Sequence, residues 1–90
     1  MQLSRHAQTR LAQRAIPPVA IDWLQQFGQA QRTGDATRYA FDKKGRRRLE
    51  GYLGSIGLKS LKKVLDAYMV ISDDETLITA GYRTQRFQKL

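Results

Sequence analysis

The chain has 90 residues, no cysteine and a formal net charge of +8, from 16 Lys and Arg against eight Asp and Glu. This length makes one domain, residues 1–90, with a modest core, and the lack of cysteine excludes a disulfide framework and a thiolate metal site. No apolar run approaches the roughly 20 residues that span a bilayer, and the N-terminus lacks the apolar segment of a signal peptide, so we expect a cytoplasmic protein without a membrane partner.

A first helix is predicted over about residues 4–14. Ser4 is its expected N-cap, because a serine hydroxyl accepts a hydrogen bond from a free N–H group of the first turn. Apolar residues spaced four apart predict the buried stripe of this helix, and they are Leu3, Ala7 and Leu11.

The same helix carries the single histidine of the chain in register with two arginines. His6, Arg10 and Arg14 follow one another at steps of four, so their side chains fall within an arc of roughly 80°. This arc overlaps the apolar stripe, which places the three residues at the border of the core. Two interpretations stay open: a surface that faces phosphate, or a structural set in which the arginines pair with acidic groups.

Ile16-Pro17-Pro18 ends the first helix, because a residue before proline is driven out of the helical region. A second helix is then predicted from Pro18, which suits a helix start, to Gly28, which suits a helix end. Helical spacing predicts its buried face, which consists of Ala20, Trp23, Leu24 and Phe27.

Alternating apolar and polar residues predict two pairs of strands. Residues 29–33 and 37–41 form the first pair, with an edge strand first. Residues 64–72 form a strand that is expected to be covered on both faces, because it is almost continuously apolar. Residues 75–83 are its partner, and strict alternation places Leu77, Thr79 and Gly81 on one face.

A run of five cations follows the first strand pair, in Asp42-Lys43-Lys44-Gly45-Arg46-Arg47-Arg48. Asp42 is expected to cap a helix that ends at Gly54, and residues 55–63 are expected to form a loop, with a helical turn within it as the alternative. The cations cannot all point one way on a helix, so they predict a broad positive surface for phosphate contacts. We assign nucleic-acid binding to Lys43, Lys44, Arg46, Arg47 and Arg48; the alternative is a solvated face with no ligand.

The predicted order of elements is helix, helix, strand, strand, helix, strand, strand. It defines an α+β domain in which helices pack on one face of a small antiparallel sheet. Asp66 is expected to pair with an arginine or to mark the start of the third strand. Residues 84–90 are expected to form a loosely held tail.

The positive charge favours a polyanionic partner, either a nucleic acid or an acidic protein. The chain has no Gly-rich phosphate loop, and one histidine without cysteine argues against zinc, so no metal or cofactor is expected. Cleavage of RNA without a metal requires fewer special groups from the protein, because the 2′-hydroxyl of the substrate is the nucleophile. The protein has only to exchange a proton and to neutralise the charge of the phosphate. The catalytic candidates are His6, Arg10, Arg14, Tyr82 and Arg83, with Tyr68 as an alternative hydroxyl.

Three segments carry a resemblance to a known family: SRHAQTRLAQRAIP, RYAFDKKGRRRL and LDAYMVISDDETLITAGYR. Together they resemble a widespread uncharacterised bacterial domain family with an N-terminal SRHA…R…R helix. That family is similar to plasmid toxins of the RelE and BrnT kind, and more broadly to the ribonuclease fold of barnase, colicins and RelE. The resemblance implies a metal-independent endoribonuclease that acts on RNA or at the ribosome, and an acidic antitoxin as a further partner.

The chain departs from this family at two positions. Ala15 stands where the family commonly has glycine, and Gly81 interrupts the closing strand, where it predicts a bulge that redirects Tyr82 and Arg83. Two other functions stay open, a non-catalytic nucleic-acid-binding module and a protein-interaction or inhibitor domain for an acidic partner. In a further alternative there is no active site, and His6 and the arginines only lock the first helix to the sheet.

Overall fold

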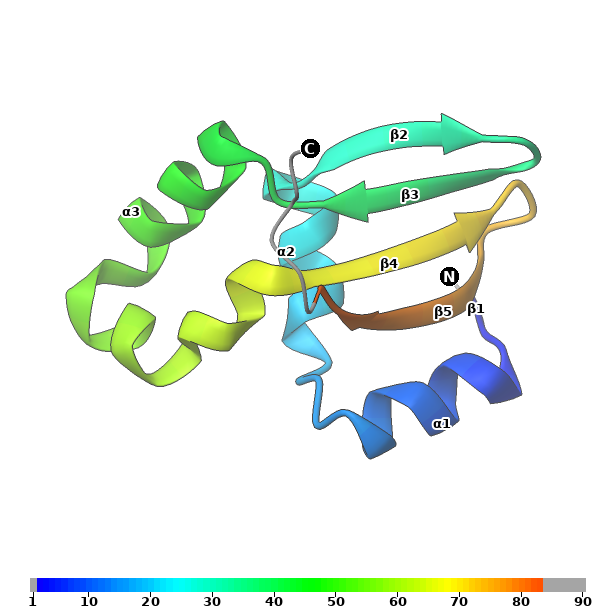
Figure 1. Ribbon diagram of the computed structural model, residues 1–90, viewed down its shortest axis with the longest axis horizontal. Helices are drawn as coiled ribbons and strands as arrows, with labels where there is room; N and C mark the ends of the chain where they lie inside the picture. Colours follow the sequence, from blue (N-terminus) through cyan, green and yellow to red (C-terminus); the bar gives the residue numbers. More distant parts are fainter. Residues whose placement is uncertain (1, 84–90) are drawn as a thin grey trace.

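The computed structural model describes residues 2–83, of which residues 55–61 are described by their backbone alone. Residues 84–90, the predicted tail, lie outside the described residues. The elements in chain order are β1 (Gln2–Leu3), α1 (Arg5–Gln13), α2 (Val19–Phe27), β2 (Gln29–Thr33), β3 (Ala36–Ala40), α3 (Lys43–Leu61), the 3-10 helix η1 (Lys62–Asp66), β4 (Ala67–Ser72) and β5 (Thr76–Tyr82). The predicted α+β class is confirmed, as is the order of the larger elements (Figure 1).

The strands form one sheet in the order β1-β5-β4-β3-β2. Its four longer strands pair antiparallel, whereas the two-residue β1 pairs parallel to β5, with Leu3 beside Leu77. The placement of Leu3 in the stripe of the first helix is therefore wrong. α1 begins only after Ser4, whose hydroxyl oxygen accepts a hydrogen bond from the Ala7 N–H group at 3.0 Å, as expected for the N-cap.

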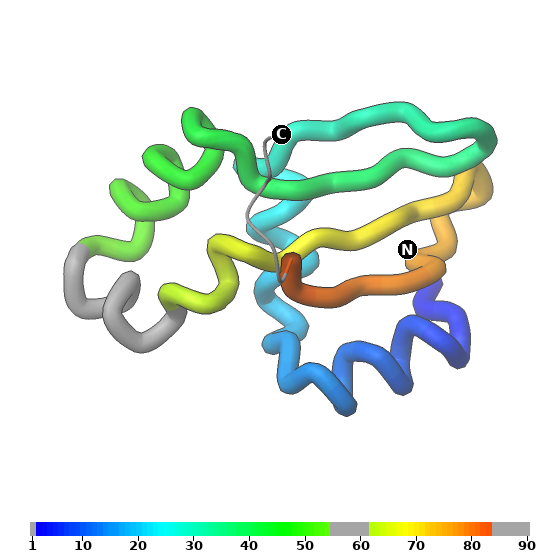
Figure 2. Tube along the Cα trace, in the orientation of Figure 1, coloured from blue at the N-terminus to red at the C-terminus, as the bar shows by residue number. Residues whose placement is uncertain are grey.

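The helices leave one face of the sheet uncovered. α2 packs behind β3 and β4, α1 runs beside β5, and α3 leads away from the sheet before η1 returns the chain to β4 (Figures 1 and 2). The largest fully buried side chains of the core are Leu24, Phe41, Leu49, Met69 and Leu77. Within residues 2–83 no helix covers the opposite side of the sheet, which we call the open face.

Alternation along β4 decides which side chains reach the open face. Ala67, Met69 and Ile71 are buried in the core, so the intervening Tyr68 and Val70 point the other way and are half-buried. The described helices thus cover this strand on one face, in contrast to the expected cover on both.

β5 contains a bulge at Ile78. Thr79 and Leu77 pair with two successive residues of β4, so Ile78 is the extra residue between them. Leu77 therefore faces the core, while Thr79 and Gly81 face the open side. The predicted common face of Leu77, Thr79 and Gly81 is wrong for this reason, and the bulge lies three residues before Gly81 rather than at it.

α3 is interrupted at Gly54, where φ is 75° and ψ is 174°. The predicted helix end at Gly54 corresponds to this kink, but helical backbone resumes over residues 55–61 and continues into η1. Of the two alternatives for residues 55–63, the loop is wrong and helical structure is found, because Val64 and Leu65 of η1 are buried and this packing favours a compact helical connection over the local propensity. β4 consequently begins at Ala67 rather than at residue 64.

Candidate nucleic-acid interface

Tyr68 lies at the centre of the open face between two small residues. In the sheet register it stands beside Ala40 of β3 and beside Gly81 of β5. Neither neighbour has a side chain long enough to cover the tyrosine ring. The ring and its hydroxyl are consequently accessible to longer side chains that reach the open face from other elements.

Arg14 reaches this face from the C-terminal end of α1. Its Nη1 donates a hydrogen bond to the Ala80 carbonyl oxygen at 3.4 Å. A Cβ atom at position 81 would overlap Nη1 of Arg14 and would lie 3.0 Å from the Tyr68 hydroxyl oxygen. Because Gly81 has no side chain, the Arg14 guanidinium group can lie close to the Tyr68 hydroxyl.

Arg38 reaches Tyr68 from the other side. Its guanidinium carbon lies 5.2 Å from the centroid of the Tyr68 ring, a cation–π contact that fixes the arginine on the face of the ring. No side chain or backbone group of the described residues accepts a hydrogen bond from the Arg38 guanidinium. Its N–H donors are thus held in place and remain available to an anionic or polar ligand.

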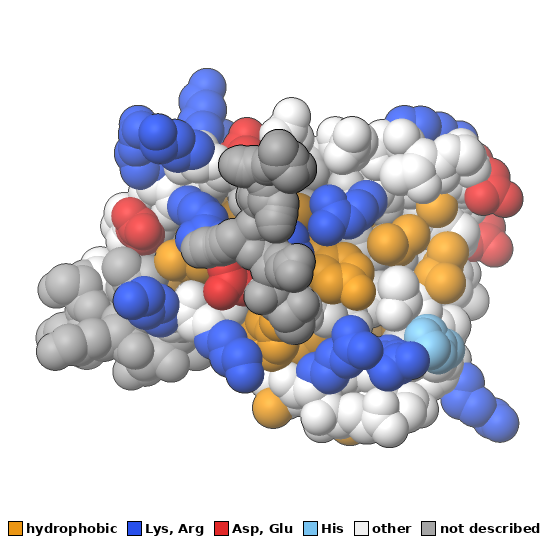
Figure 3. Space-filling view, in the orientation of Figure 1, with side chains coloured by type: hydrophobic (Ala, Val, Ile, Leu, Met, Phe, Trp, Pro, Cys, Tyr) orange, Lys and Arg blue, Asp and Glu red, His pale blue; other side chains and the backbone are white. Residues whose placement is uncertain are grey.

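Arg83 lies at the end of β5, on the border of the same face. Its Nη2 donates to the Phe41 carbonyl oxygen at 3.1 Å, and its backbone N–H donates to the Asp66 carbonyl oxygen at 2.8 Å. We call Arg14, Arg38, Tyr68 and Arg83 the open-face cluster. Figure 3 shows Lys and Arg side chains on this side of the molecule, over the strands and along α1.

His6, Arg10 and Arg14 have the predicted spacing on α1, but their side chains are not equally exposed. Arg10 Nε donates to His6 Nε2 at 3.3 Å, and Arg14 follows one turn later. His6 is exposed, whereas Arg10 and Arg14 are half-buried, so the expected place of His6 at the core border is wrong. The exposure of these three residues differs because α1 packs along β5 through Ala7, which is fully buried.

Tyr82 is not brought into the open-face cluster. It is paired with Ala67 on the core side of the sheet, and its hydroxyl donates to the Ala15 carbonyl oxygen at 3.2 Å. The Lys63 ammonium lies 4.9 Å from the centroid of its ring, and burial raises the pKa of the Tyr82 hydroxyl. These contacts tie the connection between α1 and α2 to β5.

The basic run occupies the first turns of α3. Asp42 caps the helix as expected, since its Oδ1 accepts a hydrogen bond from the Gly45 N–H group at 2.7 Å. Arg46 forms an ion pair with Asp66 at 2.8 Å, which confirms the expected pairing of Asp66 with an arginine. The other four cations, Lys43, Lys44, Arg47 and Arg48, are exposed beyond the end of the sheet.

Arg38 is a site residue that was not predicted from the sequence. Its signal was the alternation of β3, which puts Arg38 on the face opposite to Tyr39 of the core. Its value as a site residue depends on Tyr68, which is 30 positions away in the chain and becomes a neighbour only through the pairing of β3 with β4.

Among residues 2–83 no group of three or more His, Cys, Asp or Glu side chains could hold a metal ion. In the same part of the chain no helix is long and apolar enough to cross a membrane. Comparison of the chain with protein-family models, curated proteins and solved structures finds no match. The features of the molecule that bear on function are the open-face cluster and the charge of the chain.

Proposed function

We propose that this protein acts on RNA as a metal-independent endoribonuclease of the toxin class, resembling the RelE and BrnT toxins, with the open face as its RNA-binding surface. The observation that carries the proposal is the convergence of Arg14 and Arg38 on Tyr68. Two guanidinium groups and a phenol hydroxyl on one face supply directed donors for the acceptor atoms of an RNA strand.

The roles of the cluster follow from the chemistry of RNA transesterification. The 2′-oxygen attacks phosphorus, the bond to the 5′-oxygen breaks, and the products are a 2′,3′-cyclic phosphate and a 5′-hydroxyl. Negative charge accumulates on the non-bridging oxygens, where Arg14 and the Tyr68 hydroxyl stabilise it. His6, the single imidazole of the chain, is the candidate for proton exchange, because imidazole both accepts and donates a proton near neutral pH.

The remaining cations extend the surface along an RNA strand. Arg10 lies one turn before Arg14 on α1, and the exposed cations of α3 lie beyond the opposite end of the sheet. Phosphates on both sides of the cleaved bond, in free or ribosomal RNA of the cytoplasm, would contact these two groups. An acidic antitoxin would bind the same cations and block the open face.

A cleavage assay with short RNA in the presence of EDTA tests the proposal. The wild-type protein should yield a 2′,3′-cyclic phosphate end, and a single 2′-deoxy substitution at the cleaved nucleotide should stop the reaction. Tyr68→Phe keeps the ring under Arg38 and removes the hydroxyl, so the rate should fall about 100-fold with RNA affinity within about twofold. Arg5→Gln, a change of an exposed cation on α1 outside the cluster, is the matched control and should leave both quantities unchanged.

A non-catalytic RNA-binding module is the second candidate. It is favoured by one observation, that the only imidazole of the chain lies on α1 and is bonded to Arg10 rather than placed on the sheet beside Tyr68. In the same assay this candidate predicts affinity that Arg38→Gln weakens, without any cleavage product. Absence of both binding and cleavage would contradict both candidates.

A further inference from the structure

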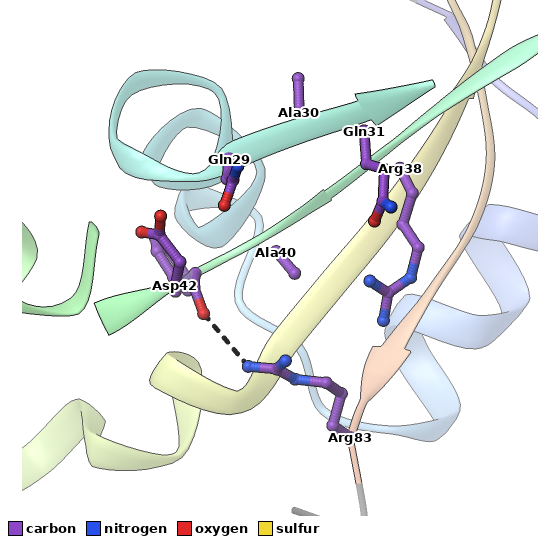
Figure 4. Close-up of a pocket in the computed structure, with 8 residues that line it drawn as sticks. Gln29, Ala30, Gln31, Arg38, Ala40, Asp42 and Arg83 are labelled. Carbon is purple, nitrogen blue, oxygen red and sulfur yellow. Dashed lines mark hydrogen bonds between the residues drawn. The ribbon is translucent and has the colours of Figure 1, made fainter. Parts of the chain in front are cut away.

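A cavity of about 330 Å³ opens beside the open-face cluster, between β2, β3 and Arg83. Figure 4 shows Gln29, Arg38, Asp42 and Arg83 arranged around Ala40. This volume lies at the small end of the range of about 300–1,000 Å³ that is typical of small-molecule sites. The cavity is therefore large enough for one planar ring system and too small for a folded ligand.

The register of the hairpin explains why these side chains share one space. Gln29 stands opposite Ala40, and Gln31 stands opposite Arg38, so all four point to the same face of the sheet. Ala40 is only 8% exposed and forms the floor. A methyl group at this position leaves the room above it that a longer side chain would fill.

The polar groups around this floor include both hydrogen-bond donors and a hydrogen-bond acceptor. Arg38 is fixed on Tyr68 with its N–H donors facing no acceptor of the described residues, and Arg83 is held at the rim by the Phe41 carbonyl oxygen. Asp42 uses Oδ1 to cap α3, while no group of the described residues donates to its Oδ2. The cavity thus offers two guanidinium groups and one carboxylate, so it favours a ligand that carries both hydrogen-bond acceptors and donors.

We propose that this cavity binds a guanine base of single-stranded RNA, an inference that rests on the proposed action on RNA and names its preferred nucleotide. Guanine alone among the four bases offers two adjacent acceptors, O6 and N7, to an arginine, and two adjacent donors, N1–H and N2–H, to a carboxylate. Arg38 and Asp42 supply these partners from two sides of the floor. Gln29 and Gln31 add amides that either donate or accept.

Titration of the ¹⁵N-labelled protein with nucleoside 5′-monophosphates tests this assignment. GMP should shift the backbone amide signals of Gln31, Ala40 and Asp42 and should bind at least about fivefold more tightly than AMP, CMP or UMP, the lower end for a bidentate contact with a base. IMP, which lacks the N2 amine, should bind with intermediate affinity.

Asp42→Asn is the decisive variant, because asparagine is as good an N-cap as aspartate and keeps the start of α3. It should weaken GMP binding about fivefold and abolish the preference over AMP, since the amide replaces one acceptor oxygen by a donor. A phosphate site predicts the reverse, that removal of a negative charge strengthens the binding of all four nucleotides. That result, or the absence of shifts at the cavity with GMP, would overturn the assignment.

Arg38→Gln should also lose the preference for GMP, whereas Arg5→Gln removes the same charge elsewhere and should keep it. These outcomes are separate from those of the proposed function. RNA cleavage without any preference for guanine would contradict the base pocket and leave the endoribonuclease standing. Selective GMP binding without RNA cleavage would support the pocket and contradict the endoribonuclease.

Discussion

The guanidinium of Arg14 occupies the space into which a side chain at position 81 would extend. Arg14 ends the first helix and Gly81 lies near the end of the last strand, yet a Cβ at position 81 would overlap Arg14 Nη1. The absence of a side chain in β5 thus allows a cation from α1 to reach Tyr68 on the open face. The interruption of the closing strand by glycine is explained by this contact.

Gly81→Ala should displace Arg14 from Tyr68. Because Arg14 Nη1 is the end of a flexible side chain that can move aside, we expect a small loss in the free energy of unfolding, together with a loss of RNA affinity. The two effects separate in a double-mutant cycle, in which RNA affinity is measured by fluorescence anisotropy for Gly81→Ala, Arg14→Ala and the double variant. Once Arg14 is absent, Gly81→Ala should reduce affinity no further. An additive loss would show that Gly81 acts on RNA binding independently of Arg14.

Substitution of glycine by alanine at the start of α3 and in its middle should change the stability of the protein in opposite directions. Gly45→Ala places a Cβ against the carbonyl oxygen of Phe27, so it should destabilise the protein by about 1–3 kcal/mol. Gly51→Ala meets no atom within 4 Å on an exposed helical position, and it should stabilise by about 0.5–1 kcal/mol through helix propensity. Chemical denaturation of both variants measures the difference, and equal signs would contradict the packing of α3 on α2.

Acidic pH should weaken the turn between β4 and β5. Arg32 donates two hydrogen bonds of 2.7 Å to Asp73 and so holds the pKa of this carboxyl below its usual range, while hydrogen bonds from Ser72 and Thr76 lower the pKa of Asp74. Lowered pKa values contribute stability above the unfolded-state pKa, about 3.9, and this contribution is lost as the pH falls through the folded-state values.

The corresponding measurement is the melting temperature of wild type and Asp73→Asn between pH 7 and pH 2. The wild type should melt slightly higher at neutral pH, with a small difference because the pair is exposed, and the two curves should converge below pH 4. Arg32→Gln should behave like Asp73→Asn. A constant offset at every pH would contradict the ion pair as its cause.

Local patterns were sufficient for most of the fold. The stops at Pro17 and Gly28, the cap at Asp42 and the alternation of the hairpins each act within a few residues, and they predict the elements found. β1 carries no pattern because it has two residues, and the bulge at Ile78 shifts the register without a sequence signal. The helical connection after Gly54 depends on the burial of η1, which no local propensity shows.

The candidate site was harder to predict than the fold, because its contacts join distant segments. The step-of-four spacing correctly put His6, Arg10 and Arg14 on one side of α1, and only the packing of that helix on β5 decides that Arg14 alone reaches Tyr68. Arg38 stood out in no motif. Tyr82 and Tyr68 looked equivalent in sequence, and the sheet register places their side chains on opposite faces.

We expect RNA to bind on the open face. The most direct measurement of this binding is chemical-shift mapping of the ¹⁵N-labelled protein with a non-cleavable 2′-deoxy analogue of a single-stranded RNA. Shifts should concentrate at Arg14, Arg38, Tyr68 and Gly81, and buried residues of α2 such as Ala20 should stay unchanged. Shifts confined to the cations of α3, with none on the sheet, would contradict RNA binding on the open face.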